Sequence, residues 1–433
     1  MNYNGKKVAF TTLGCKLNFS ETSTIARSFQ EMGFDRTGFR DKADVYVINT
    51  CSVTDTADKK SRAIIRQAIR QNPAAFVVVV GCYAQLKPDE VAGIDGVDLV
   101  LGANDKFNIT KYLDGLEKHK KGEVHNCSFT RINKFDHAYS YGDRTRSFLK
   151  VQDGCNYFCT YCTIPMARGK SRNPSITSLV EEANRAGEQG IREIILTGVN
   201  IGDFGQSTGE TFYDLVQALD EVESVDRIRI SSIEPNLLND DIIEFVSRSK
   251  RIAPHFHIPL QAGTNEVLKL MARRYDRELF ARRVEKIKEL LPHAFIGVDV
   301  IAGMNGESDK LFDESYRFIE GLDISQLHVF PYSERSKTSA LNIEGVVPVP
   351  ERKRRVEQLK ELSNRKLKDF YLKHDGQTHK VLFESSRSKT RITGWTENYI
   401  KVETDFRDEL INQIREVKLA GINPTGNMAI HVD

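Results

Sequence analysis

Residues 148–162, FLKVQDGCNYFCTYC, carry the strongest signal of fold and chemistry in the chain. This stretch begins as a strand-like apolar segment and ends in Cys155, Cys159 and Cys162, separated by three and then two residues. Three thiolates in one loop can each bind one iron of a 4Fe–4S cube, whose protein ligands are cysteine sulfurs. The fourth iron then has no protein ligand, and an open position is what chemistry at a metal requires. The spacing predicts a catalytic iron–sulfur cluster.

A zinc site is the alternative for these three cysteines. Structural zinc takes four ligands, commonly as two pairs such as C-x2-C with a second pair further on. The loop at 155–162 contains no fourth cysteine and no histidine. The iron–sulfur interpretation is therefore favoured over zinc.

From residue 147 onward, apolar runs alternate with helical patterns. A β-strand that leads through a helix into the next strand is typical of a parallel β/α architecture. Eight such units close an ordinary barrel, so six predict a partial one, with its functional loops after the strands. The six candidate strands are 147–154, 193–199, 227–232, 256–260, 294–303 and 326–331.

The N-terminal part of the chain shows the same alternation. Its apolar strands are separated by helical patterns at 21–33 and 56–71. Such strands predict a parallel sheet that is covered on both faces. The candidate strands are 7–14, 44–50, 76–81 and 97–102.

Three more cysteines follow strands of this sheet. Cys15, Cys51 and Cys82 each come directly after one of the predicted strands. Open α/β sheets bind ligands at the carboxyl edge, where these thiols should converge. They predict a second iron–sulfur cluster, again with one free iron; three unrelated buried cysteines are the alternative. Cys127 lies in a polar segment, and we expect it to be a free thiol without a role.

Residues 376–433 differ in composition from the rest of the chain. Short β-prone runs separated by polar turns between 376 and 433 predict a small closed β-barrel. Cations at 387–391 stand close to Trp395 and Tyr399, a combination typical of single-stranded RNA platforms. For Trp395 itself we expect a place in the core of the barrel, with base stacking as the alternative.

Composition sets wider limits. The chain has 433 residues, of which 40% are hydrophobic and 28% charged, enough for two or three globular domains. It has no apolar run of membrane-spanning length and no signal-peptide pattern at its start, so we expect a cytoplasmic protein with no membrane contact. Net charge is only +2. Basic segments at 58–70 and 351–370 are expected to be solvated helix faces, with polyanion contact as the alternative.

The cysteine motifs resemble those of a known family. C-x3-C-x2-C after the first strand of a partial barrel is similar to the radical S-adenosylmethionine (SAM) superfamily. The segments Leu13-Gly-Cys15-Lys-Leu-Asn18, Asn49-Thr-Cys51 and Gly81-Cys82-Tyr83 resemble the N-terminal domain of methylthiotransferases. This resemblance extends over nearly the whole chain and ends in a C-terminal domain similar to the RNA-binding TRAM module.

The resemblance implies cofactors and a reaction. Members carry two 4Fe–4S clusters and use two equivalents of SAM, one supplying the methyl group and the other a 5′-deoxyadenosyl radical. An electron donor such as flavodoxin or ferredoxin would reduce the cluster. Three residues after barrel strands, with Arg274 further along the chain, would bind SAM; turn bonding or helix-end solvation are the alternatives. The three are Gly198, Glu234 and Gln261.

The family divides by acceptor. The run 12–18 and the residues after Cys51 look most like the subfamily that converts N6-threonylcarbamoyladenosine at position 37, in the tRNA anticodon stem-loop, to its 2-methylthio derivative. Isopentenyladenosine in tRNA and a ribosomal-protein aspartate are the alternative acceptors. A non-catalytic iron–sulfur protein that binds RNA or senses redox state is the alternative from another class. Two loops depart from the family pattern, at 303–307 and 331–338.

Together these observations predict an α/β protein with three domains. A parallel-sheet domain at 3–117 is followed by a linker at 118–142. A partial (β/α)6 radical SAM barrel is expected at 143–371, and a TRAM-like β-barrel at 372–433.

Overall fold

The computed structural model describes residues 3–113, 115–142, 145–386 and 388–431. By contacts it divides into two compact units. The first contains 1–140, 148–174 and 333–338, and the second contains 141–147, 175–332 and 339–433. The three-domain division along the sequence remains a prediction. Arg387, part of the expected RNA-binding run, lies outside the described residues.

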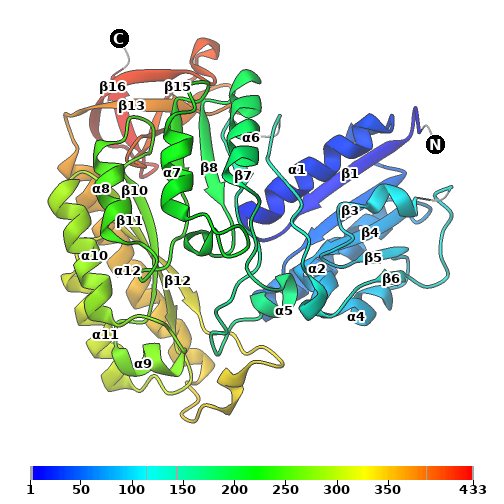
Figure 1. Ribbon diagram of the computed structural model, residues 1–433, viewed down its shortest axis with the longest axis horizontal. Coiled ribbons are helices and arrows are strands. Elements are labelled where there is room, and N and C mark those ends of the chain that lie inside the picture. Colours follow the sequence, from blue (N-terminus) through cyan, green and yellow to red (C-terminus); the bar gives the residue numbers. More distant parts are fainter. Residues whose placement is uncertain (1–2, 114, 143–144, 387, 432–433) are drawn as a thin grey trace. The chain divides into compact units, whose positions relative to one another are not determined.

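The first unit is built on a six-stranded parallel sheet with the order β2-β1-β3-β4-β5-β6 (Figure 1). Its strands are β1 (Lys7–Thr12), β2 (Asp35–Thr37), β3 (Val45–Thr50), β4 (Phe76–Gly81), β5 (Leu99–Leu101) and β6 (Glu123–His125). Its helices are α1 (Lys16–Glu31), α2 (Asp55–Gln71), α3 (Cys82–Leu86) and α4 (Pro88–Ala92), with short 3-10 turns η1 (Ile109–Tyr112) and η2 (Phe129–Arg131).

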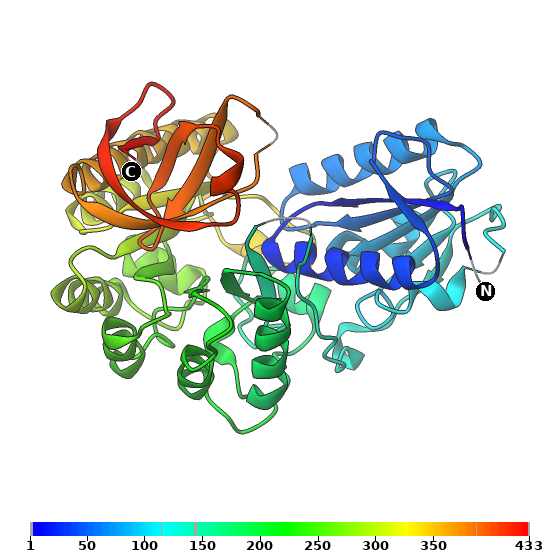
Figure 2. The same ribbon diagram turned by 90° about the horizontal axis from the view of Figure 1, so that it is seen from above.

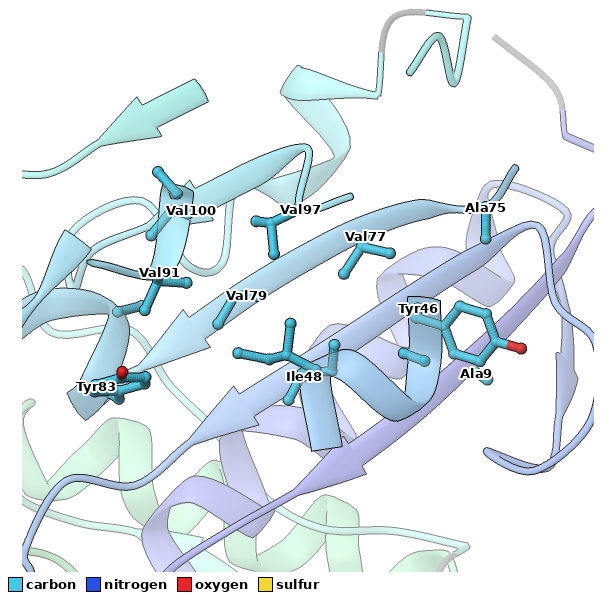
Figure 3. Packing of buried hydrophobic residues seen from close by; sticks show 14 of the residues in the cluster. Ala9, Tyr46, Ile48, Ala75, Val77, Val79, Tyr83, Val91, Val97 and Val100 are labelled. Atoms are coloured by element: carbon cyan, nitrogen blue, oxygen red, sulfur yellow. The ribbon is translucent and has the colours of Figure 1, made fainter. Parts of the chain in front are cut away.

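Successive side chains of a strand point to opposite faces of the sheet. Both faces are buried here because each packs against helices. On one face Val77 and Val79 of β4 pack with Val91 of α4 (Figure 3). Ile65 of α2 belongs to the same cluster. On the other face Val78 and Val80 pack with residues of α1 and η1. This explains why β4 reads as an unbroken apolar run.

The first unit also includes the segment that carries the second cysteine motif. Strand β7 (Ser147–Lys150) leads into the cysteine loop, which is followed by helix α5 (Ile164–Arg168). Tyr139 forms an antiparallel bridge with Leu149, and Asp153 forms one with Arg172. All six cysteines predicted as cluster ligands therefore lie in one compact unit.

The second unit continues the strand–helix alternation. Strands β8 and β9 pair in parallel, as do β10, β11 and β12, and Ser232 bridges β9 to β10. The strands are β8 (Glu193–Thr197), β9 (Arg227–Ile230), β10 (His255–Gln261), β11 (Phe295–Ala302) and β12 (Gln326–Pro331). The helices are α6 (Ile176–Glu188), α7 (Phe212–Asp220), α8 (Asp240–Arg248), α9 (Asn265–Leu270), α10 (Arg277–Leu290), α11 (Asp309–Gly321) and α12 (Val349–Lys373), with 3-10 turns η3 (Ile201–Asp203) and η4 (Ser339–Asn342).

The C-terminal strands form a closed five-stranded barrel in the order β13-β14-β15-β17-β16, drawn in orange and red in Figure 2. Its strands are β13 (Thr378–Phe383), β14 (Arg391–Thr396), β15 (Lys401–Asp405), β16 (Ile414–Ile422) and β17 (Met428–His431), with a 3-10 turn η5 (Asp408–Leu410). The barrel core also packs against Phe370 and Tyr371 of α12. The predicted fold class is confirmed.

Two strands were not predicted. β2 and β6 are three residues long, too short to show an alternating pattern, and β6 lies in the stretch expected to be an irregular linker. Each completes one edge of the parallel sheet. Among the described residues, no helix is long and apolar enough to cross a membrane.

The basic segment on α12 is only partly a solvated helix face. On α12, Arg355 bonds Glu307, Glu351 and Asp309, and Lys360 pairs with Glu357. Arg355 is buried, whereas Lys360 is exposed, so the solvated-face interpretation does not hold for the whole of 351–370.

Candidate iron–sulfur site

The three N-terminal cysteines lie at the carboxyl ends of β1, β3 and β4, which are neighbours in the sheet. Adjacent strands are about 4.8 Å apart, so these strand ends are close together. The thiols of Cys51, Cys82 and Cys15 are within electrostatic reach of one another. Cys51 and Cys82 are buried and Cys15 is exposed, so the group opens to one side.

Two glycines make room for this arrangement. Gly14 has a φ of +100°, and a Cβ there would come within 2.9 Å of the Cys51 Cβ and 3.0 Å of its Sγ. Gly81 has a φ of +96°, and a Cβ there would lie 2.4 Å from the backbone oxygen of Thr50. Only glycine suits such backbone conformations at such close contacts.

Burial makes these thiols poor acids. It raises the pKa of Cys51 to about 12, with a smaller contribution from the neighbouring Cys82 thiol, and it also raises the pKa of Cys82. A coordinated metal ion removes this penalty because a ligating thiol is deprotonated outright. Three converging sulfur donors therefore fit an iron–sulfur cluster, whose ligands are thiolates.

The second cysteine motif is shaped by its own backbone. The Cys155 N–H donates to the carbonyl of Gly169 and the Cys162 N–H to that of Cys159, both at 3.0 Å. Backbone N–H groups also point at the sulfurs: that of Tyr157 lies 3.3 Å from the Cys155 Sγ, and that of Ile164 lies 3.5 Å from the Cys162 Sγ. Such donors favour the thiolate form and tune a bound cluster.

A site for a single metal ion differs from a cluster site, because one ion needs several ligands around the same point. Within the described residues, no three His, Cys, Asp or Glu side chains have the arrangement that binds one metal ion. A 4Fe–4S cube instead takes each thiolate on a different iron. The absence of a single-ion site from the described residues therefore does not count against the six cysteines as cluster ligands.

Arg168 links the two cysteine motifs. It stands on α5, six residues after Cys162, and its Nη2 donates to the Oδ1 of Asn18 at 2.5 Å. Asn18 is three residues after Cys15, and its Nδ2 donates to the backbone oxygens of Leu13 and Thr50. Helices α3 and α5 are also packed together. The segments that carry the two motifs are therefore held side by side.

Arg168 belongs to a buried charge cluster, which we define as Glu21, Lys106, Lys150, Asp153, Arg168 and Arg172. Its Nη1 bonds Glu21 at 3.0 Å and Asp153 at 2.9 Å. Lys106 bonds Glu21 at 2.6 Å, and Lys150 bonds Asp153 at 2.8 Å.

The charge cluster has four cations and two carboxylates. Burial raises the pKa of Glu21, but Arg168 and the two lysines outweigh it and hold that pKa well below its usual range. Arg168 and Lys106 also act on the Cys82 thiol, favouring its thiolate. The surplus positive charge suits an anionic group at Cys82.

A second buried ion pair lies beside Cys51. Asp58 of α2 accepts from the Ser52 hydroxyl at 2.6 Å and from Arg335 Nη2 at 2.9 Å, and its side chain is fully buried. Arg335 also donates to the Ser52 hydroxyl at 2.8 Å. Because Ser52 follows Cys51 directly, this pair fixes the loop at 333–338 next to a predicted cluster ligand.

The residues predicted to bind SAM belong to the second unit. Glu234 follows β9 and is paired with Arg273; burial raises its pKa, while Arg273 and Arg274 oppose that rise. Gln261 ends β10 at a register shift and has a φ of +67°, a strained conformation that clusters at functional sites. Gly198 directly follows β8, and Arg274 is exposed.

Two further polar residues of this unit have clear partners. Asp299 Oδ1 lies 2.8 Å from His257 Nε2. Glu307, in one of the loops that depart from the family pattern, accepts from the Gly303 N–H at 2.6 Å and from Arg355 at 2.8 Å. Glu307 therefore stabilises the loop at 303–307 and connects it to α12.

The expected place of Trp395 in the barrel core is wrong. Ile392, Gly394 and Thr396 of β14 point inward, so the alternation places Trp395 on the outer face, where it is half-buried. One side of its ring stacks on Tyr399 at 4.4 Å, and the guanidinium of Arg146 lies 5.3 Å from its centroid. Its indole N–H donates to Glu384 at 3.1 Å. These contacts occupy the ring that base stacking would need.

Sequence reasoning missed the charge cluster entirely. Glu21, Lys106 and Arg168 are separated by 85 and 147 positions along the chain, and nothing local marks them as partners. The only sequence signal was the pair of charges Lys150 and Asp153 directly before the cysteine loop.

Two family models match the chain. Residues 7–102 match the uncharacterized protein family UPF0004, and residues 149–319 match the radical SAM superfamily. The solved structure of the radical SAM methyltransferase TsrM from Kitasatospora setae covers 75% of this chain, which covers 73% of it, with a TM-score of 0.54 and 14% identity. This likeness shows the fold alone. The class is thus a radical SAM enzyme with an N-terminal UPF0004 domain.

Full-length relatives narrow this class. A threonylcarbamoyladenosine tRNA methylthiotransferase of Bacillus subtilis is 41% identical over 95% of this chain and 93% of its own length. The protein of the same name from Aquifex aeolicus is 40% identical over 94% of this chain and 99% of its own length. A tRNA-2-methylthio-N6-dimethylallyladenosine synthase of Bacillus subtilis is 30% identical over 96% of this chain and 84% of its own length. The chain belongs to the radical SAM methylthiotransferase family, as its motifs indicated, and that family implies a 4Fe–4S cluster and SAM.

Proposed function

We propose that this chain converts N6-threonylcarbamoyladenosine in tRNA to its 2-methylthio derivative. The observation that carries the proposal is the full-length identity of 41% and 40% with two relatives named for this substrate, against 30% for a relative named for dimethylallyladenosine. Position 37 of the anticodon stem-loop is the proposed site of modification. A cytoplasmic location is part of the same proposal.

We propose two clusters, one on Cys15, Cys51 and Cys82 and one on Cys155, Cys159 and Cys162. When bound, the clusters and SAM supply the electron transfer, the radical and the transferable methyl and sulfur groups. A small reduced electron carrier such as flavodoxin or ferredoxin is the proposed electron donor.

The chain's own residues hold and insulate these groups. Gly14 and Gly81 keep the N-terminal thiols close, and Asn18 with Arg168 fixes the two cysteine motifs relative to each other. The charge cluster supplies positive charge beside Cys82. In the second unit, Gly198, Glu234, Gln261 and Arg274 are proposed to orient SAM.

A basic cavity supports tRNA as the partner. It has a volume of about 770 Å³ and lies between the barrel and the amino ends of β9, β10 and β11 in the second unit. Three of its cations, Lys250, Lys380 and Arg415, are exposed and have no acidic partner among the described residues. Phosphate contacts of this kind position RNA without reading its sequence.

The test is an anaerobic reaction of reconstituted protein with SAM and reductant. Three acceptors are offered in parallel: tRNA carrying threonylcarbamoyladenosine, tRNA carrying isopentenyladenosine, and the ribosomal protein. We expect 2-methylthio-threonylcarbamoyladenosine from the first, measured by mass spectrometry of nucleosides. A product formed only on another acceptor contradicts the proposed substrate, and failure to form any 5′-deoxyadenosine favours a non-catalytic iron–sulfur protein.

A further inference from the structure

A second cavity, of about 300 Å³, lies in the first unit beside the cysteine motifs. Three of its lining residues are close to predicted cluster ligands, in sequence or by a hydrogen bond. Gln85 is one turn after Cys82 on α3, Thr163 follows Cys162 directly, and Arg335 bonds Ser52, the neighbour of Cys51. The cavity therefore lies close to where an acceptor for sulfur would be placed.

The charged lining of this cavity has one sign. Lys87, Arg335 and Lys337 line it, and no Asp or Glu does among the described residues. Asp58, which does not line the cavity, pairs with both Arg335 and Lys87: its Oδ2 lies 2.9 Å from Arg335 Nη2 and 3.1 Å from Lys87 Nζ. Arg335 is 6% exposed, and its Nε is buried without a hydrogen-bond partner within the described residues. A buried donor left in this way is costly unless something accepts from it.

Lys337 lines the same cavity as the buried guanidinium of Arg335. It is exposed, and no acidic partner for it lies within the described part of the chain. Its φ of +67° is strained for a lysine, and such strain is typical of functional loops. The side chain is therefore presented to the cavity at an energetic cost.

We propose that this cavity receives the threonyl group of the modified base and that Arg335 and Lys337 bind its carboxylate. This inference rests on the proposed function and deepens it. A threonylcarbamoyl group ends in a carboxylate, whereas a dimethylallyl group has no charge. A cationic cavity with an unpaired donor suits the first, and it leaves that donor unpaired against the second.

The experiment measures equilibrium binding of the full-length, reconstituted protein to three anticodon stem-loops. They differ only at the N6 position of one adenosine: threonylcarbamoyl, its methyl ester, and dimethylallyl. The variant is Lys337→Asn, because asparagine tolerates a positive φ. The matched control is Lys42→Asn, an exposed lysine at the opposite, amino end of β3.

We expect the unaltered protein to prefer the carboxylate over the ester, and Lys337→Asn to lose about tenfold in that preference, the effect of one charge-assisted hydrogen bond. The control should keep the preference. A preference unchanged in Lys337→Asn overturns the inference. An equal loss on all three stem-loops also overturns it, because it indicates a backbone phosphate contact. If the unaltered protein prefers dimethylallyladenosine, the proposed function itself is wrong.

Discussion

Arg168 Nη2 donates to Asn18 Oδ1 at 2.5 Å across 150 positions of sequence. One residue follows the central cysteine loop and the other follows the first N-terminal cysteine. A single guanidinium thus connects the two segments that are proposed to hold clusters. Its remaining bonds, to Glu21 and Asp153, make it the centre of the charge cluster.

Replacing Arg168 by methionine should destabilise the protein strongly. Glu21 and Asp153 would remain buried with fewer partners, and breaking a buried pair from one side costs about 3–5 kcal/mol. Denaturant unfolding of the apoprotein measures the effect. The double variant Glu21→Gln, Arg168→Met should recover part of the loss, because it removes the stranded carboxylate. A single variant within about 1 kcal/mol of the unaltered protein would contradict a structural role for the cluster.

Stability should fall in mild acid. The pKa of Glu21 is lowered in the folded protein from an ordinary value of 4.5, so the unfolded chain binds the proton more readily. The stabilising contribution is therefore complete above about pH 5 and is lost progressively as the pH falls below 4.5 toward the folded pKa. Thermal unfolding from pH 7 to pH 4 measures this slope. Glu21→Gln should reduce the slope, and an equally steep slope in that variant would assign it to other carboxylates.

Cysteine variants should separate the two proposed clusters. Anaerobic reconstitution should give about eight irons per chain, and Cys51→Ala about four. Cys51→Ala should still cleave SAM to 5′-deoxyadenosine but form no methylthio product, whereas Cys155→Ala should lose cleavage. Cys127→Ala is the control and should keep its iron. Full iron content and product formation in Cys51→Ala would refute the N-terminal cluster.

Charge reversal at the basic cavity should weaken tRNA binding. Lys380→Glu and Arg415→Glu remove contacts proposed for phosphates, so each should lower affinity and reduce the slope of log K against log salt by about one. Filter binding at several salt concentrations measures both. Lys418→Glu is the matched control, since Lys418 is exposed on the same strand as Arg415 but does not line the cavity. A matching loss in the control would indicate a general charge effect.

The local patterns predicted most of the fold. β4 and β12 begin and end at the residues that the apolar runs indicated. A strand buried on both faces, or one with a turn at each end, has boundaries that are visible in the sequence. The three-residue strands β2 and β6 left none. Trp395 was misplaced because its aromatic character suggests burial, whereas the pleat of β14 decides which face it takes.

Local sequence patterns predicted the chemistry of the site, because cysteine spacing and the position of each thiol after a strand are properties of neighbouring residues. Only the folded chain shows that Glu21, Lys106 and Arg168 meet, and that Arg335 reaches Asp58 across 277 positions. Ion pairs between distant residues leave no periodic mark on the chain. The pairs named here are buried, and a charge buried away from water must find its partner in space.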